Sequence, residues 1–128
     1  MTRSETLTER QAELFASDNL AILATLRRDG SPQLSPVWVD WDGEHVLINT
    51  AEGRAKTKNI RRNPVVSVCV VDGDDPDNWV AITGTAELAH DGAEAQLHEV
   101  ARKYTGEDFS VRPGQQRVIV KITPERVN

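Results

Sequence analysis

Apolar and polar residues follow one another along this chain with spacings that predict short strands and three helices. Thr8 and Gln11 have the spacing of a helical capping box, and the apolar residues around them recur every three to four positions, which predicts a helix over residues 8–16. Further helices are expected over about residues 54–62 and 92–105. Strands are expected where apolar residues alternate or run together, over residues 20–26, 33–41, 46–50, 65–71, 79–88 and 118–122.

Tight-turn signals join several of these strands. Asp29-Gly30 and Asp42-Gly43 each lie between two strand-like runs, and Asp-Gly is a strong signal for a hairpin, so the first three strands are expected to form an antiparallel meander. Pro36 cannot donate a ladder hydrogen bond and therefore predicts an edge or bulged strand, while Gly84 predicts a bulge or a close backbone approach. Mainly hairpin connections favour a six-stranded antiparallel barrel, mainly β with helices at its rim, over a doubly wound α/β sheet.

The run VVSVCVV over residues 65–71 is apolar almost throughout, which indicates a strand that is buried on both faces. It contains Cys69, the single cysteine of the chain, so an internal disulfide framework is excluded. A lone cysteine in an apolar run is expected to pack as a small apolar side chain.

The length of 128 residues predicts a single domain over residues 1–128. No apolar run approaches the roughly 20 residues that a membrane span needs, and the first residues lack the apolar core of a signal peptide. We therefore expect a cytoplasmic protein that has no membrane partner. The formal net charge of −5 also argues against nucleic-acid binding.

A cationic cluster stands out against this acidic background. The segment RAKTKNIRRN over residues 54–63 holds five of the fifteen Lys and Arg residues and no acid. It follows a strand-like run and is expected to open a helix, whose first backbone N–H groups can bind an anion. Thr57, Asn59 and Asn63 add hydrogen-bonding groups suited to phosphate oxygens. From the helix alone, a solvated cationic face is the alternative interpretation.

Residues for acid–base or metal chemistry do not form a recognisable pattern in the sequence. The three histidines (His45, His90 and His98) lack metal-ligand spacing, and the acidic segment over residues 72–77 lacks the ligand order of a calcium loop. If the protein is an enzyme, a bound cofactor is expected to carry the chemistry.

Four segments resemble the pyridoxamine 5′-phosphate oxidase superfamily, whose members share a split β-barrel that binds flavins, as in FMN-binding proteins. The segments are residues 20–43, 46–70, 79–88 and 117–122, which span most of the chain in the order of the family. The segment around RAKTKN and RRNP is the most specific. Within the superfamily the sequence is similar to small actinobacterial oxidoreductases that use the deazaflavin coenzyme F420.

The resemblance implies a homodimer with two cofactor sites at the subunit interface. Family members place the cofactor phosphate against the start of the basic helix, a position that corresponds to Arg54, Lys56, Thr57 and Asn59. The resemblance does not decide whether the other cations of the helix (Lys58, Arg61 and Arg62) contact a cofactor tail.

Other family positions surround the remainder of the cofactor. The strand positions that line the isoalloxazine or deazaflavin ring correspond to Gln33, Ser35 and Val37. Asn49 and Thr50 correspond to the strand end near the ribityl chain. Trp79 corresponds to an aromatic position that reaches the cofactor of the opposite subunit, with plain packing as the alternative.

Three functions are consistent with these implications. The first is an oxidoreductase that uses F420 to transfer hydride to a conjugated or polycyclic small molecule. The second is an FMN-binding oxidoreductase of the same fold, and the third is a non-catalytic protein that binds or sequesters a flavin. The chain ends soon after its last expected strand, without the extension that carries pyridoxal-phosphate contacts in pyridoxamine phosphate oxidases, so that activity is not expected.

Overall fold

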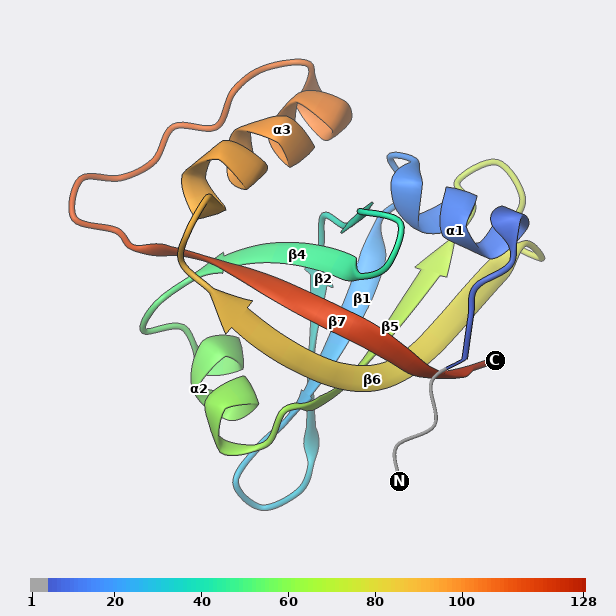
Figure 1. The fold of residues 1–128 in the computed structure, drawn as a ribbon, viewed down its shortest axis with the longest axis horizontal. Helices are drawn as coiled ribbons and strands as arrows, with labels where there is room; N and C mark the ends of the chain where they lie inside the picture. The colour runs from blue at the N-terminus through green and yellow to red at the C-terminus, as the bar shows by residue number, and fades with distance from the viewer. Residues whose placement is uncertain (1–4) are drawn as a thin grey trace.

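The structure is a computed structural model that describes residues 5–128, which form three helices and one seven-stranded antiparallel sheet (Figure 1). The sheet curls into an open half-barrel. The helices are α1 (Glu9–Ala16), α2 (Ala55–Arg62) and α3 (Ala93–Thr105). The strands are β1 (Ala21–Leu26), β2 (Pro32–Val37), β3 (Asp40–Trp41), β4 (Val46–Ala51), β5 (Val65–Val71), β6 (Trp79–Ala89) and β7 (Arg117–Val127). The barrel-like fold class and the three helices are confirmed.

The sheet has one more strand than expected, because the chain breaks where a single strand over residues 33–41 was predicted. The strand order is β2-β1-β5-β6-β7-β4-β3, so the two halves of that run lie at opposite edges of the sheet. The predicted three-stranded meander is therefore wrong. At the break, the N–H of Val39 donates to the Tyr104 hydroxyl at 3.1 Å and its C=O accepts from Lys103 Nζ at 2.5 Å. Two side chains of α3 thus replace the ladder partners that a continuous strand would have had.

The predicted turn and edge positions are confirmed. Gly30 and Gly43 adopt positive φ values of 87° and 97° in the turns that join β1 to β2 and β3 to β4. Pro36 lies in the edge strand β2. At Gly84 the pairing of β6 with β7 shifts register, and an added Cβ would lie 2.1 Å from the carbonyl oxygen of Thr123. Both the bulge and the close approach therefore occur at this glycine.

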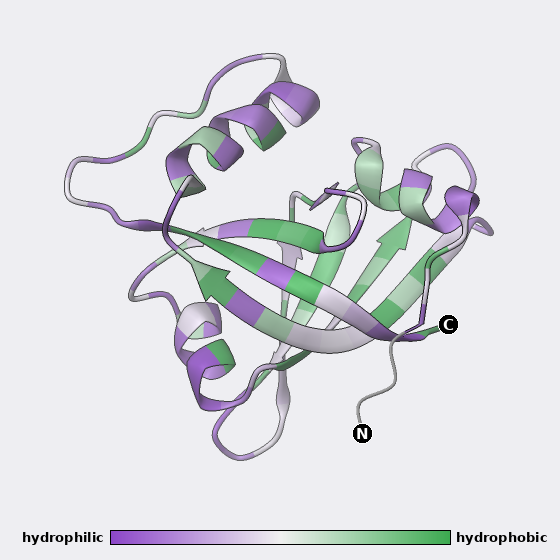
Figure 2. Ribbon diagram, in the orientation of Figure 1, coloured by the Kyte–Doolittle hydropathy of each residue, from purple (hydrophilic) through white to green (hydrophobic). Residues whose placement is uncertain are grey.

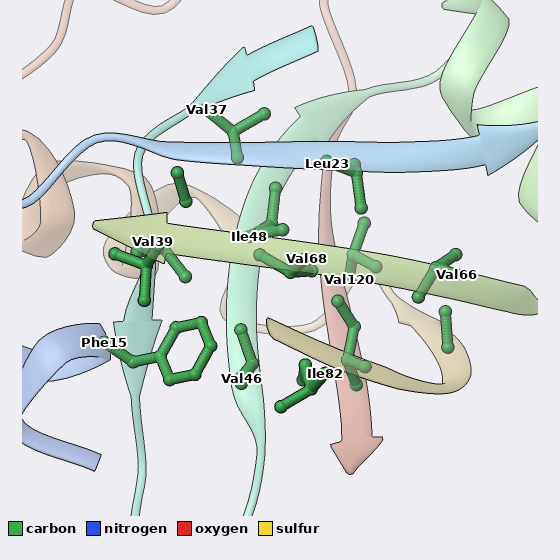
Figure 3. Packing of buried hydrophobic residues seen from close by; sticks show 14 of the residues in the cluster. Phe15, Leu23, Val37, Val39, Val46, Ile48, Val66, Val68, Ile82 and Val120 are labelled. Carbon is green, nitrogen blue, oxygen red and sulfur yellow. The ribbon is translucent and has the colours of Figure 1, made fainter. Parts of the chain in front are cut away.

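The core fills the concave side of the curled sheet, where side chains from most of the strands converge (Figure 3). Phe15 of α1 is fully buried against it beside Val39 and Val46. Thr8 fixes this helix through the predicted capping box, in which its hydroxyl accepts from the Gln11 N–H and its own N–H donates to the Gln11 side chain. Each fully buried apolar side chain of this size contributes about 1.5–3 kcal/mol. Among residues 5–128, no helix is long and apolar enough to cross a membrane.

The convex side of the sheet has two unlike parts. Helix α3 lies across β4 and β7 and covers their outer surface (Figure 1). On β2, β1, β5 and β6, outward-facing apolar side chains stay exposed, and Figure 2 shows that β1 and β5 are hydrophobic along much of their length. Val65 and Val71 are exposed while Val66, Val68 and Val70 are buried, so the expectation that this strand is buried on both faces is wrong within one chain. The described part of a single chain has no layer on the outer side of β5.

Candidate functional site

A cavity of about 400 Å³ lies between the β2 edge, the start of α2, helix α3 and the loop before β7. Its walls come from segments that are far apart in sequence. The residues that line it are Leu20, Pro36, Val37, Trp38, Asn49, Arg54, Lys56, Leu97, Val100, Phe109 and Arg117. This volume lies in the range of pockets that hold a small-molecule ligand or cofactor.

One wall of the cavity is apolar and partly aromatic. The Trp38 ring stacks on Tyr104 with centroids 5.5 Å apart and 15° between the planes, and Phe109 packs against Trp38 edge-on at 6.2 Å. The Tyr104 hydroxyl donates to the Asn19 carbonyl at 2.5 Å, which fixes the ring against the segment that joins α1 to β1. Leu97 and Val100 of α3 complete this wall. A flat conjugated ring can bury its faces against such a surface.

Another part of the cavity lining is cationic and consists of Arg54, Lys56 and Arg117, which lie close enough to affect one another's charges. Burial lowers the pKa of Lys56, and the nearby charges of Arg54 and Arg117 lower it further. Burial also lowers the pKa of Arg117, with Arg54 again contributing. No carboxylate within residues 5–128 forms an ion pair with any of the three. Three like charges that face one cavity favour an anionic ligand.

Arg117 is a site residue that the sequence analysis missed. Its Nε donates to Asn49 Oδ1 at 2.9 Å, and Asn49 Nδ2 donates to the Ala93 carbonyl at 2.8 Å and to Gln96 Oε1 at 2.7 Å. The single signal in the sequence was a cation at the first position of the apolar run RVIVKI. Strand β7 lies beside β4, and this pairing carries Arg117 to the cavity, where Asn49 holds it.

The structure brings four of the predicted site residues to the cavity lining: Val37, Asn49, Arg54 and Lys56. Arg54 is the N-cap residue of α2, but its side chain makes no capping hydrogen bond. Thr57, one turn into the helix, donates instead to the Ala51 carbonyl at 2.9 Å and is fully buried. This bond fixes the start of the helix beside the end of β4, and the cationic part of the cavity lining is positioned by it.

Gln33 and Asn59 lie away from the cavity lining, in a hydrogen-bonded group inside the barrel. Asn59 Nδ2 donates to Gln33 Oε1 at 3.0 Å and to Thr25 Oγ1 at 3.1 Å, and its Oδ1 accepts from Arg62 Nη2 at 2.7 Å. These bonds hold α2 against β1 and β2. Thr50 is also buried, and its hydroxyl has no partner among the described residues.

Ser35 and Trp79 lie elsewhere on the sheet. Ser35 is half-buried in the edge strand β2. Trp79 is 46% exposed on the bare outer surface of β6, next to Val71, with which it pairs. Neither residue lines the cavity of a single chain.

The remaining cations of α2 are exposed, and two of them have partners within the chain. Arg61 forms an ion pair with Glu52, which also contacts His90 Nε2 at 2.5 Å. Hydrogen bonds from Arg61 and His90 lower the pKa of Glu52 to about 2. Arg62 donates to the Leu26 carbonyl at 3.0 Å. Lys58 is exposed to solvent.

A curled antiparallel sheet with a cavity at the start of its basic helix defines a split β-barrel protein. The chain belongs to the pyridoxamine 5′-phosphate oxidase family, whose sequence profile matches residues 7–128.

Relatives of the chain include proteins named for coenzyme F420. It is 29% identical to the F420H(2)-dependent biliverdin reductase of Mycobacterium tuberculosis (strain CDC 1551 / Oshkosh) over 99% of this chain and 91% of the relative. A solved structure named F420 reductase superposes with a TM-score of 0.85 at 29% identity, over 95% of this chain and 98% of that one. The crystal structure of a conserved hypothetical protein of Mycobacterium tuberculosis superposes with a TM-score of 0.74 at 28% identity, over 99% of this chain and 87% of that one.

Proposed function

We propose that the protein is an F420-dependent oxidoreductase that reduces a conjugated or polycyclic small molecule. The observation that carries this proposal is a cavity lined both by an aromatic and aliphatic surface and by three cations that form no ion pair with a carboxylate of residues 5–128. The relatives named F420H(2)-dependent biliverdin reductase and F420 reductase support the choice of cofactor. FMN is the second candidate cofactor, because it combines a flat conjugated ring with a phosphate, as F420 does.

The donor groups at the cavity fit a ligand that has a phosphate and a flat ring. Arg54 and Lys56 would hold the phosphate, and each charge-assisted hydrogen bond of this kind contributes about 1.5–3 kcal/mol. Val37 and Trp38 would lie against the ring. Gln33 supports this wall from inside the barrel through its bond to Asn59.

Proton transfer by the protein is not required in this proposal. The cavity lining contains no Asp, Glu, His, Cys or Tyr among the residues that the structure describes. When bound, the reduced deazaflavin would supply hydride to a substrate stacked on it. The lining side chains bind the cofactor, orient its ring and keep water away from the reacting atoms.

A second copy of the chain is the proposed cover for the bare outer face, which we define as the outward surface of β2, β1, β5 and β6. Apolar side chains exposed on it include Leu34, Ile22, Val65, Val71 and Trp79. Ile22 pairs with both Pro36 and Cys69, which joins these strands into one continuous patch. Contiguous exposed apolar surface is typical of interaction sites, which supports the proposal that a second copy of the chain covers it.

The position of the cavity supports a role for this dimer in cofactor binding. Leu20 and Pro36 line the cavity and are exposed at the margin of the bare outer face. Trp79 lies at the same end of the sheet, because Ala21 pairs with Val70 and the next residue of β5 pairs with Trp79. A partner seated on this face would close the open side of the cavity and bring its own Trp79 near the ring.

Titration of the purified protein with F420 and with FMN tests the proposal. We expect quenching of F420 fluorescence with a submicromolar Kd and weaker binding of FMN. Turnover is then measured with reduced F420 against a panel of conjugated acceptors that includes biliverdin. Tight binding of FMN without binding of F420 would support the second candidate. Cofactor binding without reduction of any acceptor would indicate a sequestering protein.

A further inference from the structure

The guanidinium of Arg117 is buried in an unusual environment. The residue is 6% exposed, and its hydrogen-bond partners, Asn49 Oδ1 and Gln115 Oε1 at 3.0 Å, are both uncharged. The Phe109 ring also lies close by, with its centroid 5.7 Å from the guanidinium carbon. No Asp or Glu within residues 5–128 forms an ion pair with it.

Such a charge is costly unless something outside the chain compensates it. Burial and the neighbouring Arg54 lower the pKa of Arg117. A guanidinium nevertheless keeps its proton in proteins, so the charge is not relieved by deprotonation as it would be for a lysine. Buried charges are normally paired, and this one faces the cavity that Arg54 and Lys56 also line.

Asn49 directs both of its amide N–H donors and its oxygen toward the protein rather than toward the cavity. Its amide nitrogen donates to the Ala93 carbonyl and to Gln96, and its oxygen accepts from Arg117. The orientation of the amide is fixed, because a carbonyl oxygen on one side and a guanidinium on the other admit a single arrangement. Asn49 therefore holds the fork of Arg117 at a set angle beneath α3.

We propose that Arg117 binds the phosphate group of the ligand in this cavity together with Arg54 and Lys56, and that Asn49 is its positioning residue. The identity of the ligand as F420 rests on the proposed function. A planar guanidinium fork matches the geometry of phosphate oxygens and gives directional hydrogen bonds, whereas lysine contributes a point charge. The contact with Phe109 also places the phosphate site beside the aromatic wall.

The first test uses inorganic phosphate and no cofactor. Thermal unfolding of the protein is followed with increasing phosphate against chloride at equal ionic strength. Wild type should gain a phosphate-specific rise in Tm that Arg117→Gln lacks and Arg117→Lys retains in part. The matched control is Arg126→Gln, which removes an exposed charge at the other end of β7 and should respond like wild type. An equal rise in Arg117→Gln and wild type would overturn the proposal.

The second test compares F420 with the same deazaflavin chromophore lacking its phosphate-bearing tail. Arg117→Gln should raise the Kd for F420 roughly 10- to 100-fold, the loss expected for one charge-assisted hydrogen bond, and leave the Kd for the shortened chromophore unchanged. Equal weakening of both ligands would overturn the proposal, because it would assign Arg117 to the ring. An unchanged Kd for F420 with a raised KM for an acidic acceptor would also overturn it, because it would assign the anion to the substrate.

A double-mutant cycle tests the role of Asn49. Asn49→Ala should weaken F420 binding in wild type by less than Arg117→Gln does, and should add nothing in the Arg117→Gln background. Additive losses would show that Asn49 contacts the ligand itself and would overturn its positioning role. If wild type gains phosphate stability through Arg117 but does not bind F420, the proposed function fails while the anion site stands.

Discussion

The outer surface of one sheet has two parts that deviate from the usual pattern in opposite ways. Under α3, strand β7 buries the charged Arg117, which is 6% exposed, and β4 partly buries the polar Asn49. On the bare outer face, apolar side chains such as Ile22 and Trp79 remain exposed at 41% and 46%. Soluble proteins mostly bury large apolar residues and expose charged ones.

Each part has a group for which residues 5–128 supply no natural partner. The covered part has a charge without a counter-charge, and the bare outer face has an apolar surface without a covering layer. The covered part and the bare outer face adjoin at the cavity, because Leu20 and Pro36 belong both to the cavity lining and to the margin of the bare outer face. We infer that a ligand supplies the counter-charge in the covered part and that a second copy of the chain covers the bare outer face.

The largest effect is expected from a charge placed on the bare outer face. Ile22→Asp would bury an unpaired carboxylate in the proposed dimer interface, which should raise the dimer dissociation constant at least about 100-fold. Analytical ultracentrifugation measures this constant. The affinity for F420 should fall as well, because a monomer lacks the partner that closes the cavity.

Thr6→Asp is the control for Ile22→Asp, because it adds the same charge at an exposed residue that belongs neither to the bare outer face nor to the cavity lining. This variant should associate and bind F420 like wild type. A dimer that persists in Ile22→Asp would show that the bare outer face is not the contact between subunits. Wild type that sediments as a monomer at all concentrations would contradict the dimer itself.

The next effect concerns the cationic part of the cavity lining. Lys56→Ala removes a half-buried charge at the cavity and should weaken F420 binding by about 1.5–3 kcal/mol, or roughly 10- to 150-fold. Lys58→Ala removes the same charge from an exposed position of the same helix and should change the affinity less than about twofold. Similar losses in both variants would indicate a diffuse field rather than a phosphate site.

The features that the sequence predicted are those set by local chemistry. The capping box at Thr8, the positive φ of Gly30 and Gly43 and the bulge at Gly84 each depend on a few neighbouring residues or on a missing Cβ. The edge position of β2 follows from Pro36, which cannot donate to a ladder.

The features that the sequence did not predict depend on long-range arrangement. The break at Val39 is held by Lys103 and Tyr104 of a helix that is distant in sequence, so no local signal marks it. Arg117 reaches the cavity because β7 inserts between β6 and β4, and strand order is not encoded in periodicity. Conversely, Asn59 was singled out as a phosphate contact by family position, while its actual partners lie inside the barrel; its role toward a cofactor stays a prediction.

A smaller effect is expected for the buried side-chain amide of Asn59. Asn59→Ala should lower the free energy of unfolding by about 1–2 kcal/mol, because Gln33 and Thr25 lose a partner inside the barrel. Urea denaturation measures the change, and the m value should stay constant. If Asn59 acts through the fold, excess F420 should stabilise the variant as much as it stabilises wild type. A normal stability with a reduced F420 affinity would instead assign Asn59 to the ligand.

The smallest effect concerns Glu52, which joins the end of β4 to α2 through Arg61 and to the residue after β6 through His90. The carboxyl has a pKa of about 2 in the folded protein against an ordinary value of 4.5, so the unfolded chain binds the proton more readily. Its contribution to stability is therefore present above about pH 4.5 and is lost as the pH falls toward 2. Because these side chains are partly or largely exposed, solvent screening should keep the contribution below about 1 kcal/mol. Urea denaturation of wild type and Glu52→Gln at pH 7 and pH 3 should show the two curves converging at the lower pH, and parallel loss in both would contradict the assignment.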